Sequence, residues 1–166
     1  MKLPNIVMRA YAGMPEKTAE DFKNLKLHTG DLGVMDEDGY LYFKDRVKDY
    51  IRRRGENVSS MEVERIVASH PGVLEAAAVG VAAGEGAGSE QEILICVVPR
   101  EGVPDPHELL TYCSDKMPYF AVPRYVRFME HLPKTPTERV RKVELRELPM
   151  DDDVYDRVKS GPEIRA

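Results

Sequence analysis

The sequence has few of the features that mark secreted, disulfide-rich or nucleic-acid-binding proteins. It contains two cysteines and no tryptophan, and its 29 acidic residues outnumber the 24 basic ones, for a formal net charge of −5. The two cysteines, Cys96 and Cys113, lie in apolar patterns, which indicates small core residues in a reducing compartment and argues against a disulfide framework. An acidic chain offers no broad basic surface to nucleic acid. We therefore expect a cytoplasmic protein without a nucleic-acid partner.

Long hydrophobic runs are also absent. No apolar stretch approaches the ~20 residues that a helix needs to cross a bilayer. The opening MKLPNIVMRAYAGMPEK lacks the apolar centre of a signal peptide. We therefore expect no transmembrane segment. The histidines are scattered and show no metal-ligand spacing, so no metal site is expected. They are His28, His70, His107 and His131.

What is present is the composition of a soluble globular domain. Hydrophobic residues make up 42% and charged residues 32% of the 166 residues, enough for one domain with its own core. Residues 1–30 carry a predicted helix over PEKTAEDF but no set of elements that could form a domain of their own. They have the pattern expected for the end of a larger structure. From Leu32, the runs LGVM and YLYF, joined by DEDG, predict a β-hairpin. A calcium loop is the alternative for this turn, but the remaining ligand positions do not follow.

Three further helices are predicted beyond the hairpin. Ser59 and Glu62 have capping-box spacing at the start of a helix over SMEVERIVASH. Asp105 is the expected N-cap of a helix over DPHELLTYCSDKM, and VRKVELREL predicts a short last helix.

Strands are predicted over VLEAAAVGVA, EILICVVP and RYVRFM, the second of which is the clearest buried strand in the chain. We expect GEGAGSEQ to be a hairpin connection, because its glycine pattern lacks the strand–loop–helix context of a phosphate loop. The element order predicts an α+β fold, with an N-terminal β-hairpin plus a small three-stranded sheet covered by helices. The acidic tail after this sheet is expected to fray.

Four cations and one carboxylate crowd into KTPTERVRK, residues 134–142. A solvated loop is the simplest interpretation. The alternative is that Lys134, Arg139, Arg141 and Lys142 face a phosphate group. The residues of this loop alone do not decide between the two.

Two longer stretches decide it by resemblance. HTGDLGVMDEDGYLYFKDRVKDYIRRRGENVSSMEVE and PYFAVPRYVRFMEHLPKTPTERVRK resemble the adenylate-forming superfamily of acyl-CoA synthetases, luciferases and peptide-synthetase adenylation domains. The resemblance runs from about Ile6 to Leu145. It implies three parts, which are the end of the large AMP-binding domain with its β-hairpin (1–47), the small C-terminal domain (48–149) and a frayed tail (150–166). The rest of the large N-terminal domain is implied to be missing from this sequence.

The family joins a carboxylate to ATP with release of pyrophosphate, and then transfers the acyl group from AMP to CoA. The resemblance therefore implies an acid–thiol ligase whose substrates are a carboxylic acid, ATP and CoA. ATP, AMP, CoA and Mg²⁺ are implied to bind mainly to the large domain, so the isolated chain is expected to be inactive. PYFAVPRYV and KTPTE are similar to the carnitine/crotonobetaine-CoA ligase-like branch. The acyl substrate cannot be inferred, because its pocket lies in the large domain.

Three residues near the first stretch take nucleotide-binding and hinge roles by this resemblance. Asp31 matches the carboxylate that accepts hydrogen bonds from the ribose hydroxyls. Arg46 matches the arginine near the ribose and phosphate. Lys48 matches the hinge, where family members carry Asp or Lys. The alternatives are a turn-capping aspartate for Asp31 and a solvated charged turn for the two cations.

The resemblance places Arg52 and the loop Gly55, Glu56 and Asn57 on the face used for thioester formation. A glycine at position 55 would let the backbone approach the pantetheine tunnel. Three consecutive arginines usually form a solvated patch, so we expect only one or two to contact the phosphates of CoA. A plain surface carboxylate is an equal interpretation for Glu56.

KTPTERVRK departs from the family at two positions. Five residues of this segment match the pattern that the resemblance implies. They are Pro133, Thr135, Thr137, Val140 and Lys142. The family glycine is Glu138 here, and the catalytic lysine that bridges the acyl carboxylate and the α-phosphate is Arg139. Because a guanidinium is no geometric substitute for an ammonium, we expect slower adenylation with thioester formation spared.

Two other functional classes remain open. One is an adenylation domain that loads a carrier protein, although no carrier domain follows in this sequence. The other is a non-catalytic domain that binds a nucleotide or a partner, which the loss of the lysine favours. The first 30 residues argue against an independent unit, because they would expose a surface made for a neighbour.

Overall fold

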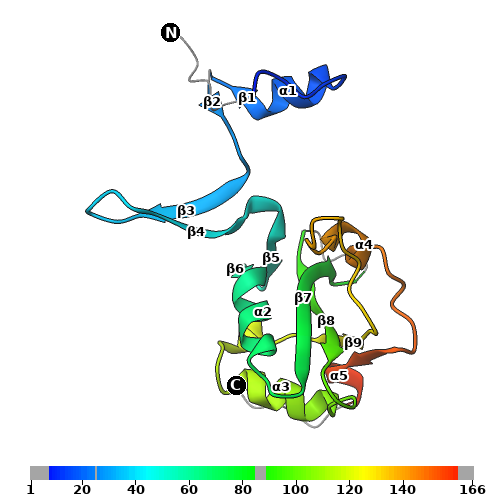
Figure 1. Cartoon of the computed structure of the whole chain (residues 1–166). Coiled ribbons are helices and arrows are strands. Elements are labelled where there is room, and N and C mark those ends of the chain that lie inside the picture. Colours follow the sequence, from blue (N-terminus) through cyan, green and yellow to red (C-terminus); the bar gives the residue numbers. More distant parts are fainter. Residues whose placement is uncertain (1–7, 25, 85–88, 161–166) are drawn as a thin grey trace. The chain divides into compact units, whose positions relative to one another are not determined.

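The computed structural model describes residues 8–24, 26–84 and 89–160. The chain divides into two compact units, Met1–Lys48 and Asp49–Ala166, and Figure 1 labels their helices and strands along the ribbon. Each unit is described by itself below.

The described part of the first unit contains one α-helix and two antiparallel strand pairs. Helix α1 (Pro15–Asp21) begins with a proline in its first turn, which suits the fixed φ of that residue. Strands β1 (Phe22–Lys23) and β2 (Lys26–Leu27) follow as an antiparallel pair. The Tyr11 hydroxyl donates to the Asp21 carboxylate at 2.9 Å and Lys17 Nζ donates to it at 2.8 Å. Both hydrogen bonds lower the pKa of Asp21, and the one from Lys17 has the larger effect.

The predicted hairpin after Leu32 is confirmed. Strands β3 (Asp31–Met35) and β4 (Leu41–Arg46) pair antiparallel. In the turn, the Asp36 carboxylate accepts from the backbone N–H groups of Tyr40 (2.8 Å) and Asp38 (3.1 Å), which lowers the pKa of Asp36. The short helix η1 (Val47–Asp49) then leads into the second unit.

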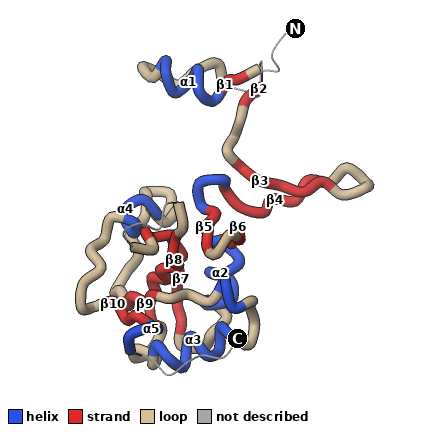
Figure 2. Tube along the Cα trace, turned by 180° about the vertical axis from the view of Figure 1, so that it is seen from behind, coloured by secondary structure: helices blue, strands red, loops and turns tan. Residues whose placement is uncertain are grey.

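The second unit is built on a four-stranded sheet in the order β10-β9-β8-β7. Figure 2 shows these strands in red. Strands β7 (Val73–Ala82) and β8 (Gln91–Pro99) form a long antiparallel hairpin. Strand β9 (Tyr125–Phe128) runs parallel to β8, and the chain reaches it through helix α3 (Pro106–Ser114) and helix η2 (Tyr119–Ala121). A parallel neighbour requires such a crossover.

Strand β8 is buried on both faces, and its side chains alternate between two cores. Ile93, Ile95 and Val97 join the cluster that includes residues of α2 (Ser60–Ala68) and α3. Leu94, Cys96 and Val98 join the cluster that includes Leu145 of α4 (Lys142–Arg146). The period of two along a strand explains this division. The sheet therefore has helices packed on both of its faces.

The predicted helix caps are present. The Ser59 hydroxyl accepts from the Glu62 N–H at the start of α2, and the Asp105 carboxylate accepts from the His107 N–H at 2.7 Å at the start of α3. Each cap satisfies a backbone donor that the helix leaves without an intrahelical acceptor.

The sequence did not predict the hairpin formed by residues 50–59. Strands β5 (Tyr50–Arg53) and β6 (Glu56–Ser59) pair antiparallel where the sequence suggested only a charged loop. The two residues between them, Arg54 and Gly55, both have positive φ, +53° and +80°. This is the geometry of a two-residue turn that follows the twist of its strands.

The α+β class is confirmed, but the sheet has a fourth strand and the predicted frayed tail is wrong as far as Ser160. Strand β10 (Val154–Asp156) pairs with β9, and α5 (Arg157–Ser160) follows it. The physical reason is an ion pair: Arg124 Nε and Nη2 each donate to the Asp156 carboxylate at 3.0 Å. Residues 161–166 of the predicted tail lie outside the described residues.

Within the described residues, no helix is long and apolar enough to cross a membrane, and no group of three or more His, Cys, Asp or Glu side chains could hold a metal ion. Cys96 and Cys113 are free and buried, as predicted, and burial raises the pKa of each thiol to about 12. The connection GEGAGSEQ does join β7 to β8, but its residues 85–88 lie outside the described residues.

Candidate functional site

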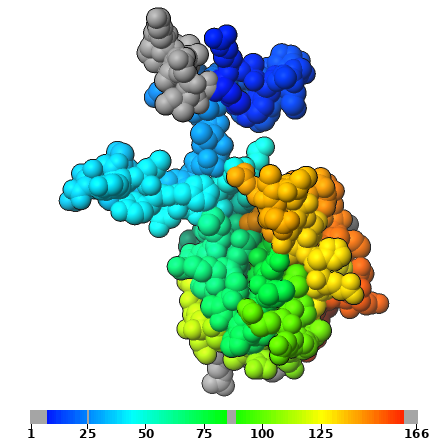
Figure 3. Space-filling view, viewed as in Figure 1, coloured from blue at the N-terminus to red at the C-terminus, as the bar shows by residue number. Residues whose placement is uncertain are grey.

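The cationic loop (residues 133–142) is a small hairpin closed by its own backbone. Lys134 and Val140 form an isolated antiparallel bridge, and the Thr135 N–H donates to the Arg139 carbonyl at 2.8 Å. The Thr135 hydroxyl accepts from the Arg139 N–H at 3.1 Å and lies 3.1 Å from the Thr137 hydroxyl. Threonines at positions 135 and 137 therefore shape the turn. The segment that contains this loop and α4 is orange in Figure 3 and lies at the surface of the second unit.

Glu138 sits at the tip of this turn with φ +61°. The left-handed region costs a non-glycine residue roughly 1 kcal/mol, because Cβ approaches the carbonyl oxygen. Glu138 thus adopts a conformation that suits glycine, and its side chain is exposed, 3.4 Å from Lys134 Nζ. The loop keeps a glycine-type backbone without the glycine.

Three of the four cations in the loop have carboxylate partners. Lys134 Nζ lies 2.9 Å from Glu75 Oε1, and hydrogen bonding to this carboxylate raises the pKa of Lys134. Lys142 Nζ lies 2.7 Å from Glu64 Oε1. A third pair joins Arg141 to Glu144. These three charges are already balanced within the domain.

Arg139 differs from its three neighbours. It is exposed, and within residues 8–24, 26–84 and 89–160 its guanidinium has no hydrogen-bond or ion-pair partner. Of the four candidate phosphate ligands, Arg139 is therefore the one whose charge is not paired with a carboxylate among the described residues.

Asp31 and Arg46 lie opposite each other in the hairpin of the first unit. They are paired in the register of β3 and β4, and Arg46 Nε lies 3.2 Å from Asp31 Oδ1. Their side chains are 36% and 60% exposed, so both can still reach a ligand. The structure brings these two predicted nucleotide-binding residues together, while their contact with a ribose stays a prediction.

Lys48 is the last residue of the first unit, and Asp49 begins the second. Lys48 lies in η1, the short helix between β4 and β5. Asp49 is fixed to its own unit by Arg146 of α4, with Asp49 Oδ1 2.7 Å from Arg146 Nη2. The hinge role of Lys48 stays a prediction, and its place at the unit boundary is consistent with it.

The predicted thioester face gathers at one hairpin end, here called the arginine turn (residues 52–57). Arg52 pairs with Asn57 across the hairpin, and Arg53 pairs with Glu56. Arg52, Gly55, Glu56 and Asn57 are all exposed. The four predicted CoA-face residues therefore share one small surface, while their roles stay predictions.

Arg53 corrects the prediction of a solvated arginine patch. Its side chain is only 2% exposed, with Nε 2.8 Å from Glu92 Oε2. Nη1 donates to the backbone carbonyls of Phe120 (3.0 Å) and Val122 (2.6 Å), and burial lowers the pKa of Arg53. The sequence signal was the strand alternation, since Arg53 follows the buried Ile51 at a spacing of two.

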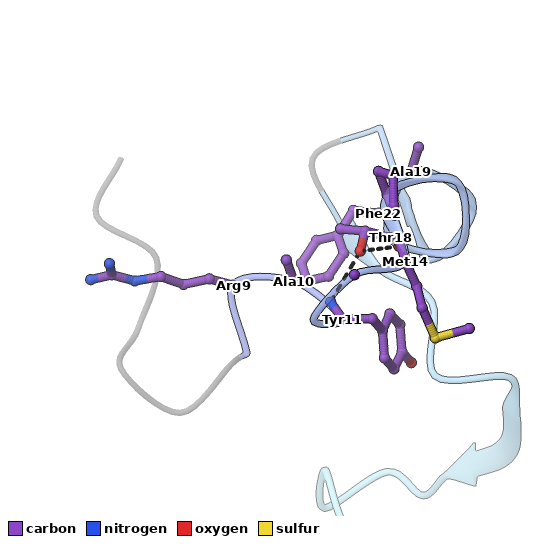
Figure 4. Close-up of a pocket in the computed structure, with 9 residues that line it drawn as sticks. Arg9, Ala10, Tyr11, Met14, Thr18, Ala19 and Phe22 are labelled. Carbon is purple, nitrogen blue, oxygen red and sulfur yellow. Dashed lines mark hydrogen bonds between the residues drawn. The ribbon is translucent and has the colours of Figure 1, made fainter.

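A hollow in the first unit was not predicted either. Figure 4 shows Tyr11, Met14, Thr18 and Phe22 around it, with the Tyr11 N–H donating to the Thr18 hydroxyl at 3.0 Å. Apolar atoms dominate its lining, and Arg9 is its only charged residue among those described. Both hydroxyls of the lining are already bonded within the unit, since Tyr11 donates to Asp21 at 2.9 Å and Thr18 donates to the Met14 carbonyl at 2.9 Å.

Comparison with known families identifies part of the chain. Residues 62–139 match the AMP-binding enzyme C-terminal domain. The matched segment runs from the first turn of α2 to Arg139 of the cationic loop.

Three curated relatives show the breadth of the similarity. The chain is 35% identical to a peroxisomal trans-cinnamate:CoA ligase of Petunia hybrida, over 95% of this chain and 27% of the relative. It is 41% identical to a long-chain-fatty-acid–CoA ligase of Escherichia coli, over 85% of the chain and 25% of the relative. It is 38% identical to ScoC, a fatty acid–[acyl-carrier-protein] ligase of Streptomyces coeruleorubidus, over 84% and 27%. The chain thus spans about a quarter of the length of these relatives.

Solved structures agree with these relatives. ATP-bound MatB of Rhodopseudomonas palustris matches 84% of this chain with 27% of its own, at 34% identity and a TM-score of 0.74. The o-succinylbenzoate CoA synthetase MenE of Bacillus subtilis, in complex with its acyl-adenylate intermediate, matches 86% of this chain with 29% of its own, at 29% identity and a TM-score of 0.75.

Proposed function

The chain belongs to the adenylate-forming superfamily and carries its AMP-binding enzyme C-terminal domain, and we propose that it acts as the small domain of an ATP-dependent acyl-CoA synthetase. In the first half-reaction a carboxylate oxygen attacks the α-phosphorus of ATP, and pyrophosphate leaves. In the second, the sulfur of CoA attacks the acyl carbon, and AMP leaves. The relatives named as CoA ligases support this assignment.

The observation that carries the proposal is the uncommitted charge of Arg139. Lys134, Arg141 and Lys142 have carboxylate partners, whereas Arg139 has none among the described residues. A cation that is free of partners and held on a closed turn is suited to stabilise the negative charge on a phosphate group under nucleophilic attack. We assign Arg139 to the α-phosphate during adenylation.

Arginine at this position alters the chemistry of the loop. A guanidinium spreads its charge over a planar fork, whereas an ammonium concentrates it at one atom that can bridge two oxygens. Adenylation is therefore expected to be slower than with lysine. Thioester formation, which we assign to the arginine turn, is expected to be unaffected.

The remaining site residues complete the proposal. Asp31 and Arg46 bind the ribose and phosphate of the nucleotide, and Lys48 is the hinge about which the second unit turns between the half-reactions. Arg52, Gly55, Glu56 and Asn57 face CoA during the second half-reaction.

A large N-terminal domain is the proposed partner for most of the substrate contacts. ATP, CoA and the carboxylic acid bind chiefly there, and Mg²⁺ is held there together with the ATP phosphates. The chain alone is expected to be inactive. We place the protein in the cytoplasm on its two free thiols, with the peroxisome of the Petunia relative as the alternative.

The acceptor thiol has a second candidate. ScoC is named as a ligase for acyl carrier protein rather than CoA, and it matches this chain as well as the CoA ligases do. A carrier-bound thiol would use the same half-reactions with a protein in place of CoA.

ATP–pyrophosphate exchange over a panel of carboxylic acids tests the proposal, in a full-length enzyme that carries this chain. Exchange with any acid would establish adenylation and identify the substrate class. Arg139→Lys is expected to raise the exchange rate by about tenfold, which corresponds to ~1.4 kcal/mol of activation free energy. Arg141→Lys is the matched control, because this arginine lies two residues away and is paired with Glu144.

The control variant is expected to leave the rate unchanged. Equal rates for Arg139→Lys and the wild type would remove Arg139 from the α-phosphate. No exchange from either folded protein, with any acid, would leave a non-catalytic domain that binds a nucleotide or a partner.

A further inference from the structure

The arginine turn is held by two side chains that lie far from it in sequence. Glu90 Oε2 accepts from the Arg54 N–H at 2.5 Å, and Glu90 Oε1 accepts from the Gly55 N–H at 3.3 Å. The Gln91 Oε1 accepts from the Arg52 N–H at 3.2 Å. Three backbone amides of the turn are thus bonded to Gln91, the first residue of β8, and to Glu90, which directly precedes the strand.

These contacts provide hydrogen-bond acceptors for backbone N–H groups of the turn. Arg54 and Gly55 both have positive φ, and in such a turn the N–H groups of the two central residues point outward with no acceptor in the hairpin itself. Arg54 also lacks the freedom of a glycine in this conformation. A carboxylate that accepts from both amides offsets part of that cost, because charge-assisted hydrogen bonds are stronger than neutral ones.

Two further residues favour the arrangement. Arg52 Nε lies 3.8 Å from Glu90 Oε1, so the carboxylate does not present an unbalanced negative charge at the turn. Gly80 of β7 leaves room for Gln91, since a Cβ at position 80 would lie 2.7 Å from the Gln91 carboxamide carbon. Strand β7 therefore accommodates the side chain that bonds to Arg52.

We propose that Glu90 is a positioning residue, which holds the arginine turn in the conformation that receives the phosphopantetheine thiol. This proposal rests on the thioester face proposed above. Glu90 acts on the second half-reaction through the backbone of Arg54 and Gly55, and it takes no part in adenylation.

Amide hydrogen exchange in the present chain tests the contact itself. Glu90→Ala is expected to speed the exchange of the Arg54 and Gly55 amides by roughly fivefold or more, because each loses its acceptor. Amides in α3 should not change. Glu101→Ala is the matched control, since the Glu101 side chain is exposed and has no hydrogen bond or ion pair in the described part of the chain. Unchanged exchange in Glu90→Ala would overturn the proposal.

Kinetics of a full-length enzyme carrying this chain test the role. Glu90→Ala is expected to raise the KM for CoA by about tenfold, with ATP–pyrophosphate exchange within twofold of the wild type. Glu90→Gln keeps one acceptor oxygen and is expected to have an intermediate KM. A KM for CoA that is lower in Glu90→Gln than in the wild type would instead mean that Glu90 repels the phosphates of CoA. That result would overturn the positioning role.

The two experiments separate two kinds of failure. Faster amide exchange with an unchanged KM for CoA would leave the contact as a purely structural one. If the wild-type enzyme does not adenylate any acid, the proposed function fails, while hydrogen exchange still reports on the contact.

Discussion

Glu138 stores strain at the tip of the cationic loop. Its φ of +61° suits glycine, and its exposed carboxylate gains little from Lys134 at 3.4 Å. We expect Glu138→Gly to raise the free energy of unfolding by about 0.5–1 kcal/mol relative to Glu138→Ala. The alanine variant loses the same ion pair but keeps the strained backbone, so it is the matched control. Urea denaturation of both variants measures the difference, and an alanine variant that proved the more stable would refute this explanation.

Arg53 and Arg52 are adjacent in sequence but differ in their surroundings. Arg53→Met removes the hydrogen bonds to two carbonyls and the 2.8 Å partner of Glu92, which keeps only the more distant Arg124 at 3.7 Å. Breaking a buried pair in this way is expected to cost about 3 kcal/mol. Arg52→Met changes an exposed side chain and is expected to cost less than about 0.5 kcal/mol. Chemical denaturation of both checks the contrast, which similar losses of stability would contradict.

At the scale of single residues, the fold brings predicted site residues together, while their roles stay predictions. Asp31 and Arg46 are in contact, and the four residues assigned to the thioester face share one turn. Glu90 could not be found from the sequence, because the distance of 36 residues from Arg54 is closed only by the fold. Arg53 was misjudged because three like residues in a row hid the alternation of a strand.

At the scale of elements, the long apolar patterns were predicted correctly and the short polar ones were not. Strands β7 and β8 and helices α2 and α3 carry enough apolar residues to show their period. Strands β5, β6 and β10 have three or four residues each, too few to show a period, and each includes at least one charged residue. Their pairing is decided by tertiary contacts, such as that of Asp156 with Arg124. Local patterns therefore could not reveal them.

Strand β10 is expected to be sensitive to acid. Burial alone would raise the pKa of Asp156, but the hydrogen bonds from Arg124 and from the Val158 amide keep it below its usual value. A pKa that is lower in the folded state means that the stabilisation is present above the unfolded pKa of about 4. It is lost as the pH falls through the folded value.

We therefore expect Asp156→Asn to destabilise the chain at pH 7 and to have much less effect near pH 3. Urea unfolding at both pH values measures this difference. Asp152→Asn serves as control, as this residue is exposed. An equal loss of stability for Asp156→Asn at both pH values would show that the carboxylate charge is unimportant.

At the scale of the whole molecule, the first unit exposes apolar side chains that a separate protein would bury. Met35, Leu41 and Tyr42 on the β3–β4 hairpin are 69%, 75% and 55% exposed. Exposed apolar patches of this kind mark interaction surfaces. We expect the isolated chain to self-associate through the hairpin, and Leu41→Lys to reduce the association without changing the unfolding of the second unit. Sedimentation velocity measures the association, and a monomeric wild type at micromolar concentration would contradict it.

The buried thiols have a practical consequence. Cys96 lies in the core on one face of the sheet and Cys113 lies in the core on the other face, and burial raises the pKa of each thiol to about 12. Neither presents a thiolate to a reagent at neutral pH while the second unit is folded. The rate of alkylation by a maleimide would therefore report the rate at which the two cores open. A cysteine added at the surface could carry a dye without removal of the two native cysteines.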